Sequence, residues 1–105
     1  MRLVGRDLLQ QFCREHPPGR SWVQAWTAEV IKARWRTPQE IKERYTTVSF
    51  VHGLTIFNVK GNDYRLATHV AYQVGIVQVE WIGTHADYSR INWESRKHEA
   101  NGRQD

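Results

Sequence analysis

The sequence lacks the features that mark secreted, membrane and multidomain proteins. A single cysteine, Cys13, leaves no partner for an internal disulfide. No apolar run approaches the roughly 20 residues that cross a bilayer, and the first residues carry no long apolar segment of the signal-peptide type. Internal repeats and low-complexity segments are absent as well. We therefore expect one cytoplasmic domain, residues 1–93, with no membrane contact, followed by a polar, mobile tail, residues 94–105.

The chain does contain enough apolar side chains for one core, and an excess of positive charge. Hydrophobic residues make up 40% of the sequence and aromatic residues 11%, with five tryptophans among them. The net charge is +4, and the excess lies in residues 1–36, which hold seven Lys or Arg against three Asp or Glu. Two interpretations of this basic segment stay open: a solvated helix face, or a surface that meets nucleic acid or an acidic partner.

Helices are predicted in the first half of the chain. Apolar residues at three-to-four spacing indicate helices over residues 7–15 and 21–34, which Pro17-Pro18-Gly19 separates into an antiparallel hairpin. Ser21 is the expected cap of the second helix. Thr37-Pro38-Gln39-Glu40 combines a capping threonine, a proline at the first helical position and a glutamate at the third. It predicts a further short helix to about Tyr45.

Strands are predicted in the second half. Residues 54–59, 64–71 and 76–82 are rich in β-branched and aromatic residues, and the loops between them are short enough for hairpins. Residues 1–4 add a short edge strand. We therefore expect an α+β domain of order β-α-α-β-β-β, an antiparallel sheet with two helices on one face.

Strand alternation assigns side chains to the two faces of this sheet. Leu66, Thr68 and Val70 should face the helices, which leaves Arg65 and His69 on the other side. His69 is then either part of a site or a filler of that open face, and Arg65 is either exposed there or paired.

The stretch after the last strand has the most informative spacing. Thr84 and Asp87 stand in capping-box relation and predict a helical turn that begins at His85. His85 and Tyr88 then share one face of that turn. A helix start presents unpaired N–H groups and a partial positive charge, which suits a phosphate. Each ring also has an ordinary interpretation, His85 as a surface residue and Tyr88 as a half-buried anchor.

Cations of the first hairpin are expected at the same end of the sheet. The strand before this hairpin and the last strand both end there, so Lys60, Asn62 and Arg65 can converge on His85 and Tyr88. For Lys60 a solvated turn position is the competing interpretation.

Other site chemistries match the sequence poorly. The histidines lack the close spacing of metal ligands, and no nucleophile-elbow sequence supports a Ser-His-Asp triad, so we expect neither metal nor cofactor. Aromatic side chains suit stacking on bases better, although a core position competes for each. Trp81 and Trp93, which flank the candidate site, are the most open cases.

Two separated segments carry an ordered pattern: FNVKGNDYRLATHV (residues 57–70) and VEWIGTHADYSRI (residues 79–91). The pattern is a Phe-Asn strand, a Gly-Asn turn, a Tyr-Arg strand and a closing Thr-His-x-x-Tyr. In this order it resembles the HigB family of bacterial toxins, members of the RelE-like mRNA interferase superfamily. The chain departs from that family at Ser89, where another acidic residue is often found, and no role is carried onto Ser89.

The resemblance implies a small RelE-like domain that cuts mRNA as an endoribonuclease, usually on the translating ribosome. It also implies a cognate HigA-type helix-turn-helix antitoxin, with operator DNA contacted only through the toxin–antitoxin complex. A non-catalytic RNA- or ribosome-binding module, or a repressor-complex partner of the same fold, is the alternative. The expected catalytic residues are His85, Arg65, Lys60 and Tyr88, and the expected RNA contacts are Asn62, His69, Trp81 and Arg90.

Overall fold

The structure is a computed structural model that describes residues 1–95 of the chain. Its strands are β1 (Arg2–Val4), β2 (Ser49–Val51), β3 (Leu54–Val59), β4 (Tyr64–Ala71) and β5 (Ile76–Thr84). Its helices are α1 (Arg6–Glu15), α2 (Arg20–Lys32), α3 (Pro38–Arg44) and α4 (His85–Arg90), with a 3₁₀ turn, η1 (Pro17–Gly19), between α1 and α2. The expected mobile tail falls outside the described residues except for its first two positions, and the domain boundary at residue 93 stays a prediction.

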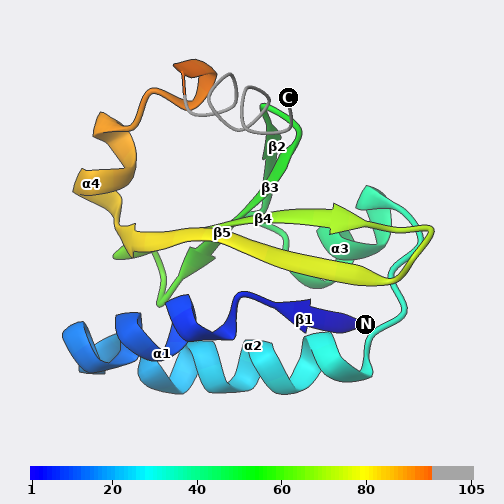
Figure 1. The fold of residues 1–105 in the computed structure, drawn as a ribbon, viewed down its shortest axis with the longest axis horizontal. Helices are drawn as coiled ribbons and strands as arrows, with labels where there is room; N and C mark the ends of the chain where they lie inside the picture. Colours follow the sequence, from blue (N-terminus) through cyan, green and yellow to red (C-terminus); the bar gives the residue numbers. More distant parts are fainter. Residues whose placement is uncertain (96–105) are drawn as a thin grey trace.

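The strands join one sheet in the order β1-β5-β4-β3-β2 (Figure 1). Strands β2 to β5 pair antiparallel through consecutive hairpins. The short loops predicted the two hairpins that join β3, β4 and β5. β1 pairs parallel with β5, so the sheet is mostly rather than entirely antiparallel. The α+β class and the order of the predicted elements are confirmed, and β2 is an additional edge strand that the sequence did not indicate.

Helices α1 and α2 cover one face of the sheet (Figure 1). η1 leads directly into α2, so Ser21 lies inside the first turn and the prediction that it caps this helix is wrong; Gly19 occupies the cap position. Gly19 is buried, and a Cβ there would lie 2.7 Å from Cε2 of Phe12, so the absence of a side chain lets the turn pack on α1. Within residues 1–95, no helix has the length and apolar character that crossing a membrane requires.

The predicted cap of α3 is confirmed. The Thr37 Oγ1 accepts a hydrogen bond from the Glu40 backbone N at 3.3 Å, and Pro38 is the first helical residue. The cap fixes the direction of a short helix whose Ile41 is fully buried.

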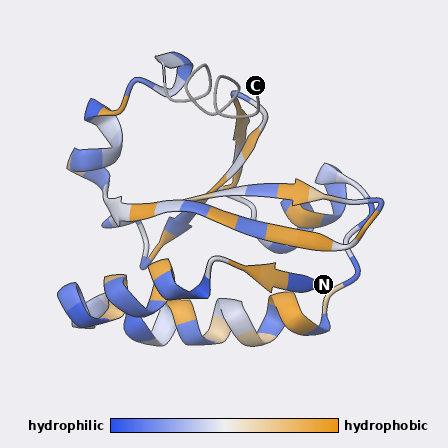
Figure 2. Cartoon of the chain, viewed as in Figure 1, coloured by the Kyte–Doolittle hydropathy of each residue, from blue (hydrophilic) through white to orange (hydrophobic). Residues whose placement is uncertain are grey.

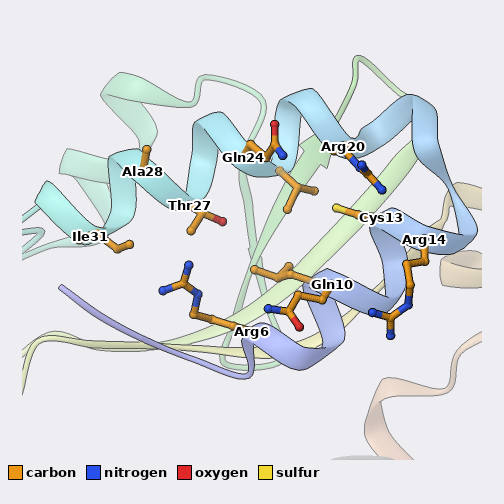
Figure 3. Close-up of a pocket in the computed structure, with 11 residues that line it drawn as sticks. Arg6, Gln10, Cys13, Arg14, Arg20, Gln24, Thr27, Ala28 and Ile31 are labelled. Atoms are coloured by element: carbon orange, nitrogen blue, oxygen red, sulfur yellow. The ribbon is translucent and has the colours of Figure 1, made fainter.

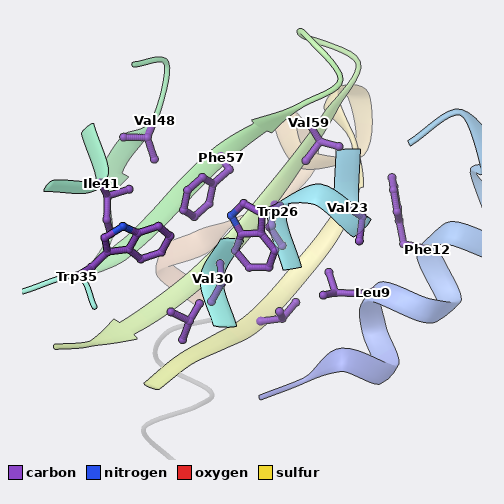
Figure 4. Close-up of a cluster of buried hydrophobic side chains, with 13 residues drawn as sticks. Leu9, Phe12, Val23, Trp26, Val30, Trp35, Ile41, Val48, Phe57 and Val59 are labelled. Carbon is purple, nitrogen blue, oxygen red and sulfur yellow. The ribbon is translucent and has the colours of Figure 1, made fainter. Parts of the chain in front are cut away.

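The main core lies between the helices and the sheet (Figure 4). Phe57 and Leu66 of the sheet meet Trp26 and Val30 of α2, and all four are at most 1% exposed. The Trp26 and Phe57 rings lie 5.4 Å apart, close to perpendicular. Figure 2 shows β1 as largely hydrophobic, β5 as a mixture of hydrophobic and hydrophilic segments, and α1 as largely hydrophilic. The predicted inward direction of Leu66 is confirmed.

The other face of the sheet carries a second, smaller apolar cluster, here called the second-face cluster. Ile56, Ala67 and Trp93 are buried in it, and the half-buried Trp81 and Tyr88 pack against them. The chain after β5 therefore folds back and covers part of a face that alternation alone leaves open.

A β-bulge decides which side chains of β5 reach the second-face cluster. The register passes from Thr68 opposite Val79 to Ala67 opposite Trp81, so β5 has one residue, Glu80, more than β4 at this point. Strict alternation would place Val79 and Trp81 on the same face. With the bulge, Val79 packs in the main core and Trp81 in the second-face cluster.

Candidate functional site

The β3–β4 hairpin meets the start of α4 at one end of the sheet. Val59 pairs with Tyr64 and Tyr64 with Thr84, so the ends of β3 and β5 are aligned across β4. The backbone N of His85 donates to the backbone O of Asp63 at 3.0 Å. This bond ties the hairpin loop to the first residue of α4. That the side chains of Lys60, Asn62 and Arg65 converge on His85 and Tyr88 stays a prediction.

The cap of α4 is also as predicted, but its consequence differs from the expectation. The Thr84 Oγ1 accepts a hydrogen bond from the Asp87 backbone N at 3.0 Å. The N–H groups of His85 and Asp87 are therefore both occupied, by Asp63 and Thr84. The expectation of unpaired N–H groups as a phosphate site at this helix start is wrong at these two positions, and binding an anion falls to the nearby cations.

His85 and Tyr88 have different surroundings although both belong to α4. The His85 imidazole is exposed, and among residues 1–95 it has no hydrogen bond or ion pair. The Tyr88 ring is half-buried between Trp93, 5.5 Å away, and Trp81, 6.1 Å away, measured between ring centroids. Tyr88 thus anchors α4 on the second-face cluster, while His85 is free to meet a ligand.

Arg65 is held by neutral acceptors. Its Nη2 donates to the Asn62 Oδ1 at 2.5 Å, and its Nη1 donates to the backbone O of Tyr64 at 3.0 Å and of Asn62 at 3.3 Å. Within the described chain no carboxylate pairs with this guanidinium. Arg65 is therefore oriented by the hairpin and keeps its charge available to an anion.

The space beside Arg65 depends on Gly83, its register partner on β5. A Cβ on Gly83 would lie 2.7 Å from Cζ2 of Trp81, so only glycine lets the Trp81 ring pack over this position. Across β3, Asn58 is the other register partner of Arg65.

Lys60 and Arg90 are exposed cations with acidic neighbours in their own elements. The Lys60 Nζ lies 3.7 Å from the Asp63 Oδ2, and the Arg90 Nη1 lies 3.6 Å from the Asp87 Oδ1. Both ion pairs are more than half exposed, so they are weak and can be exchanged for a phosphate. Lys60 has a positive φ of 50°, which is uncommon outside glycine and fixes the hairpin reversal next to the site.

His69 is the predicted contact that lies apart from the others. It occupies the same face as Arg65 but four residues farther along β4, about 13 Å at the usual rise of a strand. Its register partner is Gln78 on β5, and it is exposed there. Trp81, by contrast, packs over Gly83, the register partner of Arg65, on the face that the bulge gives it.

A family model described as HigB toxin, the RelE-like toxic component of a toxin–antitoxin system, matches residues 20–91. The match covers more than half of the chain and includes every site residue described above. The chain belongs to the HigB toxin family. A comparison with curated proteins gave no match.

Membership in the HigB family means that the chain is a toxin whose natural partner is an antitoxin. In this HigB-family toxin the pieces of the candidate site come from the β3–β4 hairpin, β4 and α4. They are positioned by that hairpin, by the pairing of β4 with β5 and by the cap of α4. Among residues 1–95, no group of three or more His, Cys, Asp and Glu is placed to hold a metal ion.

Sequence reasoning missed Asn58 and Asp63. Asn58 is polar and half-buried beside Arg65, a position that strand alternation across the hairpin would have indicated. Asp63 contributes its backbone O to His85 and its carboxylate to Lys60. No sequence signal distinguishes Asp63 from an ordinary turn residue, because its role depends on how closely α4 approaches the hairpin.

Proposed function

We propose that this toxin is an mRNA interferase, an endoribonuclease that cleaves mRNA on the translating ribosome in the cytoplasm. The observation that carries the proposal is that one hairpin loop contacts both residues: Asp63 accepts a hydrogen bond from the backbone N of His85, and Asn62 orients the Arg65 guanidinium. The His85 side chain is exposed and has no hydrogen bond or ion pair among residues 1–95. An imidazole can transfer protons near neutral pH, and a guanidinium binds phosphate with two parallel hydrogen bonds.

Cleavage proceeds by attack of a ribose 2′-hydroxyl on the adjacent phosphorus. The 2′-oxygen forms a bond to phosphorus and the bond to the 5′-oxygen breaks, which leaves a 2′,3′-cyclic phosphate and a 5′-hydroxyl. His85 transfers a proton in this step, either from the 2′-hydroxyl or to the leaving 5′-oxygen. No metal or cofactor is needed for the balance of atoms and charge.

The cations stabilise the phosphorane. Arg65 contacts the non-bridging phosphate oxygens, and its existing bonds to Asn62 keep the guanidinium aimed before the substrate arrives. Lys60 adds a second positive charge once the phosphate replaces its weak pairing with Asp63. Tyr88 positions the scissile nucleotide or acts as the second proton donor.

The surrounding side chains supply RNA contacts. Trp81 is half-buried and offers a ring to a base, while Asn62 and Arg90 offer polar contacts. His69 is a more distant contact, reached only by an RNA that follows the strand face. The repressor role of the complex, with a HigA-type helix-turn-helix antitoxin contacting operator DNA, belongs to the same proposal.

The decisive experiment measures cleavage of mRNA by purified ribosomes in the presence of toxin variants. His85→Ala should lower the rate by about 10²–10⁴-fold, the usual contribution of acid–base catalysis. His52→Asn is the matched control, because His52 is exposed in the distant β2–β3 turn with a positive φ of 54° that asparagine tolerates. Full activity of His85→Ala would remove this residue from the mechanism.

Arg65→Ala tests the phosphate site and end-group analysis tests the chemistry. We expect a loss of about 10²–10³-fold, as for other donors to a developing charge, with Arg36→Ala as an exposed arginine control far from the site. A 2′,3′-cyclic or 3′-phosphate end supports 2′-hydroxyl attack. Ribosome binding without any cleavage would favour the non-catalytic RNA-binding alternative.

Ribosome dependence is a separate part of the proposal. His85, Lys60 and Arg90 are all exposed, so the protein itself offers little surface to bend an RNA into an in-line geometry. Free mRNA should therefore be cut much more slowly than ribosome-bound mRNA. Equal rates on both would remove ribosome dependence and leave the nuclease in place.

A further inference from the structure

A groove of about 550 Å³ lies between α1 and α2, on the outer side of the helical layer (Figure 3). Leu9 and Val23 form its floor, and Ile31, which is 49% exposed, lies at one end. Arg6 is at the same end as Ile31, whereas Arg14 and Arg20 are at the other (Figure 3). No carboxylate is among the described residues that line the groove.

We propose that this groove is the docking site for an acidic amphipathic segment of the antitoxin. The inference rests on membership in a toxin–antitoxin family and not on the cleavage reaction. Arginines at both ends of an apolar floor match a segment that carries apolar side chains along one face and Asp or Glu on either side of them. α1 spans about 15 Å at the usual helical rise, which accommodates roughly three helical turns of such a segment.

Two other occupants fit the groove less well. An RNA backbone gains from the arginines but leaves the apolar floor and the exposed Ile31 unused. A second copy of the chain, paired through the same groove about a twofold axis, would bring Arg14 and Arg20 toward either the same arginines or Arg6 of the other copy, so like charges would meet. The acidic segment is the occupant that uses both the charge and the apolar surface.

The groove and the candidate site lie on opposite sides of the sheet. α1 and α2 cover the face that holds Phe57 and Leu66, whereas Arg65 and Trp81 belong to the other face. Substitutions in the groove should therefore change antitoxin affinity without altering the site that cleaves RNA.

The test measures the dissociation constant of full-length toxin variants for the protein encoded by the adjacent reading frame, immobilised on a biosensor. Arg14→Glu combined with Arg20→Glu should raise the dissociation constant by about 10- to 100-fold. Arg34→Glu combined with Arg36→Glu makes the same change in net charge on exposed residues outside the groove and should leave it within about twofold. Far-UV circular dichroism verifies that both double variants are folded.

A second pair of variants tests the apolar part. Ile31→Asp should weaken binding, whereas Val74→Asp, at a residue that is 69% exposed in the β4–β5 turn, should not. Equal effects of groove and control variants, or none, would overturn the proposal. If the double variant Arg14→Glu and Arg20→Glu weakens ribosome binding but not antitoxin binding, the groove binds RNA, and the proposal is overturned as well. The binding measurement is independent of whether the chain cleaves mRNA.

Discussion

Replacing Trp93 by alanine should destabilise the protein and disturb the candidate site together. Trp93 is only 8% exposed, and it lies in the chain that returns over the second sheet face, where it packs with Ile56 and Ala67. Burial of a tryptophan removes about 150–250 Å² from water, or about 4–6 kcal/mol at roughly 25 cal/mol per Å². Measured large-to-alanine changes of aromatic residues cost about 3–5 kcal/mol. Since a domain has about 5–15 kcal/mol of stability, the variant should stay largely folded at room temperature.

The same substitution should lower cleavage per folded molecule. The Trp93 ring is one of the two aromatic neighbours of Tyr88, so its loss lets α4 and its first residue, His85, shift relative to Arg65. A displacement of about 1 Å at a catalytic group costs about 100-fold in rate, so we expect a loss between tenfold and 100-fold.

Urea unfolding followed by far-UV circular dichroism measures the first effect, and ribosomal cleavage measures the second. Trp22→Ala is the control, because Trp22 stacks on Trp26 at 6.3 Å and packs against the main core rather than the second-face cluster. It should lower the unfolding midpoint while the rate per folded molecule stays at the parental value. An unchanged midpoint for Trp93→Ala, or a parental rate per folded molecule, would refute the role given to the second-face cluster.

Other substitutions test the cap, a close packing contact and one phenol. Thr84→Ala should cost about 0.5–2 kcal/mol in urea unfolding and reduce cleavage, and Thr84→Ser should restore both. Gly83→Ala places a Cβ 2.7 Å from the Trp81 ring, so it should cost about 1–3 kcal/mol and shift the tryptophan fluorescence; an unchanged spectrum would contradict the packing. Burial, and then the hydrogen bond to Glu29, raise the pKa of Tyr45 above its ordinary value. The unfolded phenol therefore loses its proton first, and stability should fall as pH rises above about 10; Tyr45→Phe should remove part of that slope in unfolding experiments.

Features governed by neighbouring residues were predictable from the sequence. The Thr37 and Thr84 caps depend on two residues each: the threonine side chain accepts a hydrogen bond from the backbone N–H of the residue three positions later. The same rule failed at Ser21, since η1 continues into α2 and leaves no break in the backbone for a cap there. A capping rule thus holds only where the capping residue itself is extended, as Thr37 and Thr84 are.

Features set by tertiary contacts were not predictable. The face of Trp81 depends on one extra residue in β5, and alternation gives the opposite face without it. The N–H groups at the start of α4 were expected to be unpaired, because nothing in the sequence tells that Asp63 supplies a carbonyl to His85. The meeting of the β3–β4 hairpin with the start of α4 followed from hairpin topology, but the hydrogen bonding there required the folded chain.

The residues that match the family model include the whole proposed cleavage site but only one wall of the proposed antitoxin groove. It covers residues 20–91 and therefore every residue proposed for the reaction, from Lys60 to Arg90. β1 and α1 lie before it, so the wall of the groove that carries Arg6 and Arg14 lies outside the matched residues, while the opposite wall on α2 lies within them. A reaction common to the family needs the same site in each member, whereas a toxin must distinguish its own antitoxin from others, and specificity of that kind is built from surface charge and shape. Replacing Arg6 and Arg14 alone should accordingly change the affinity for the antitoxin and leave the rate of mRNA cleavage unchanged.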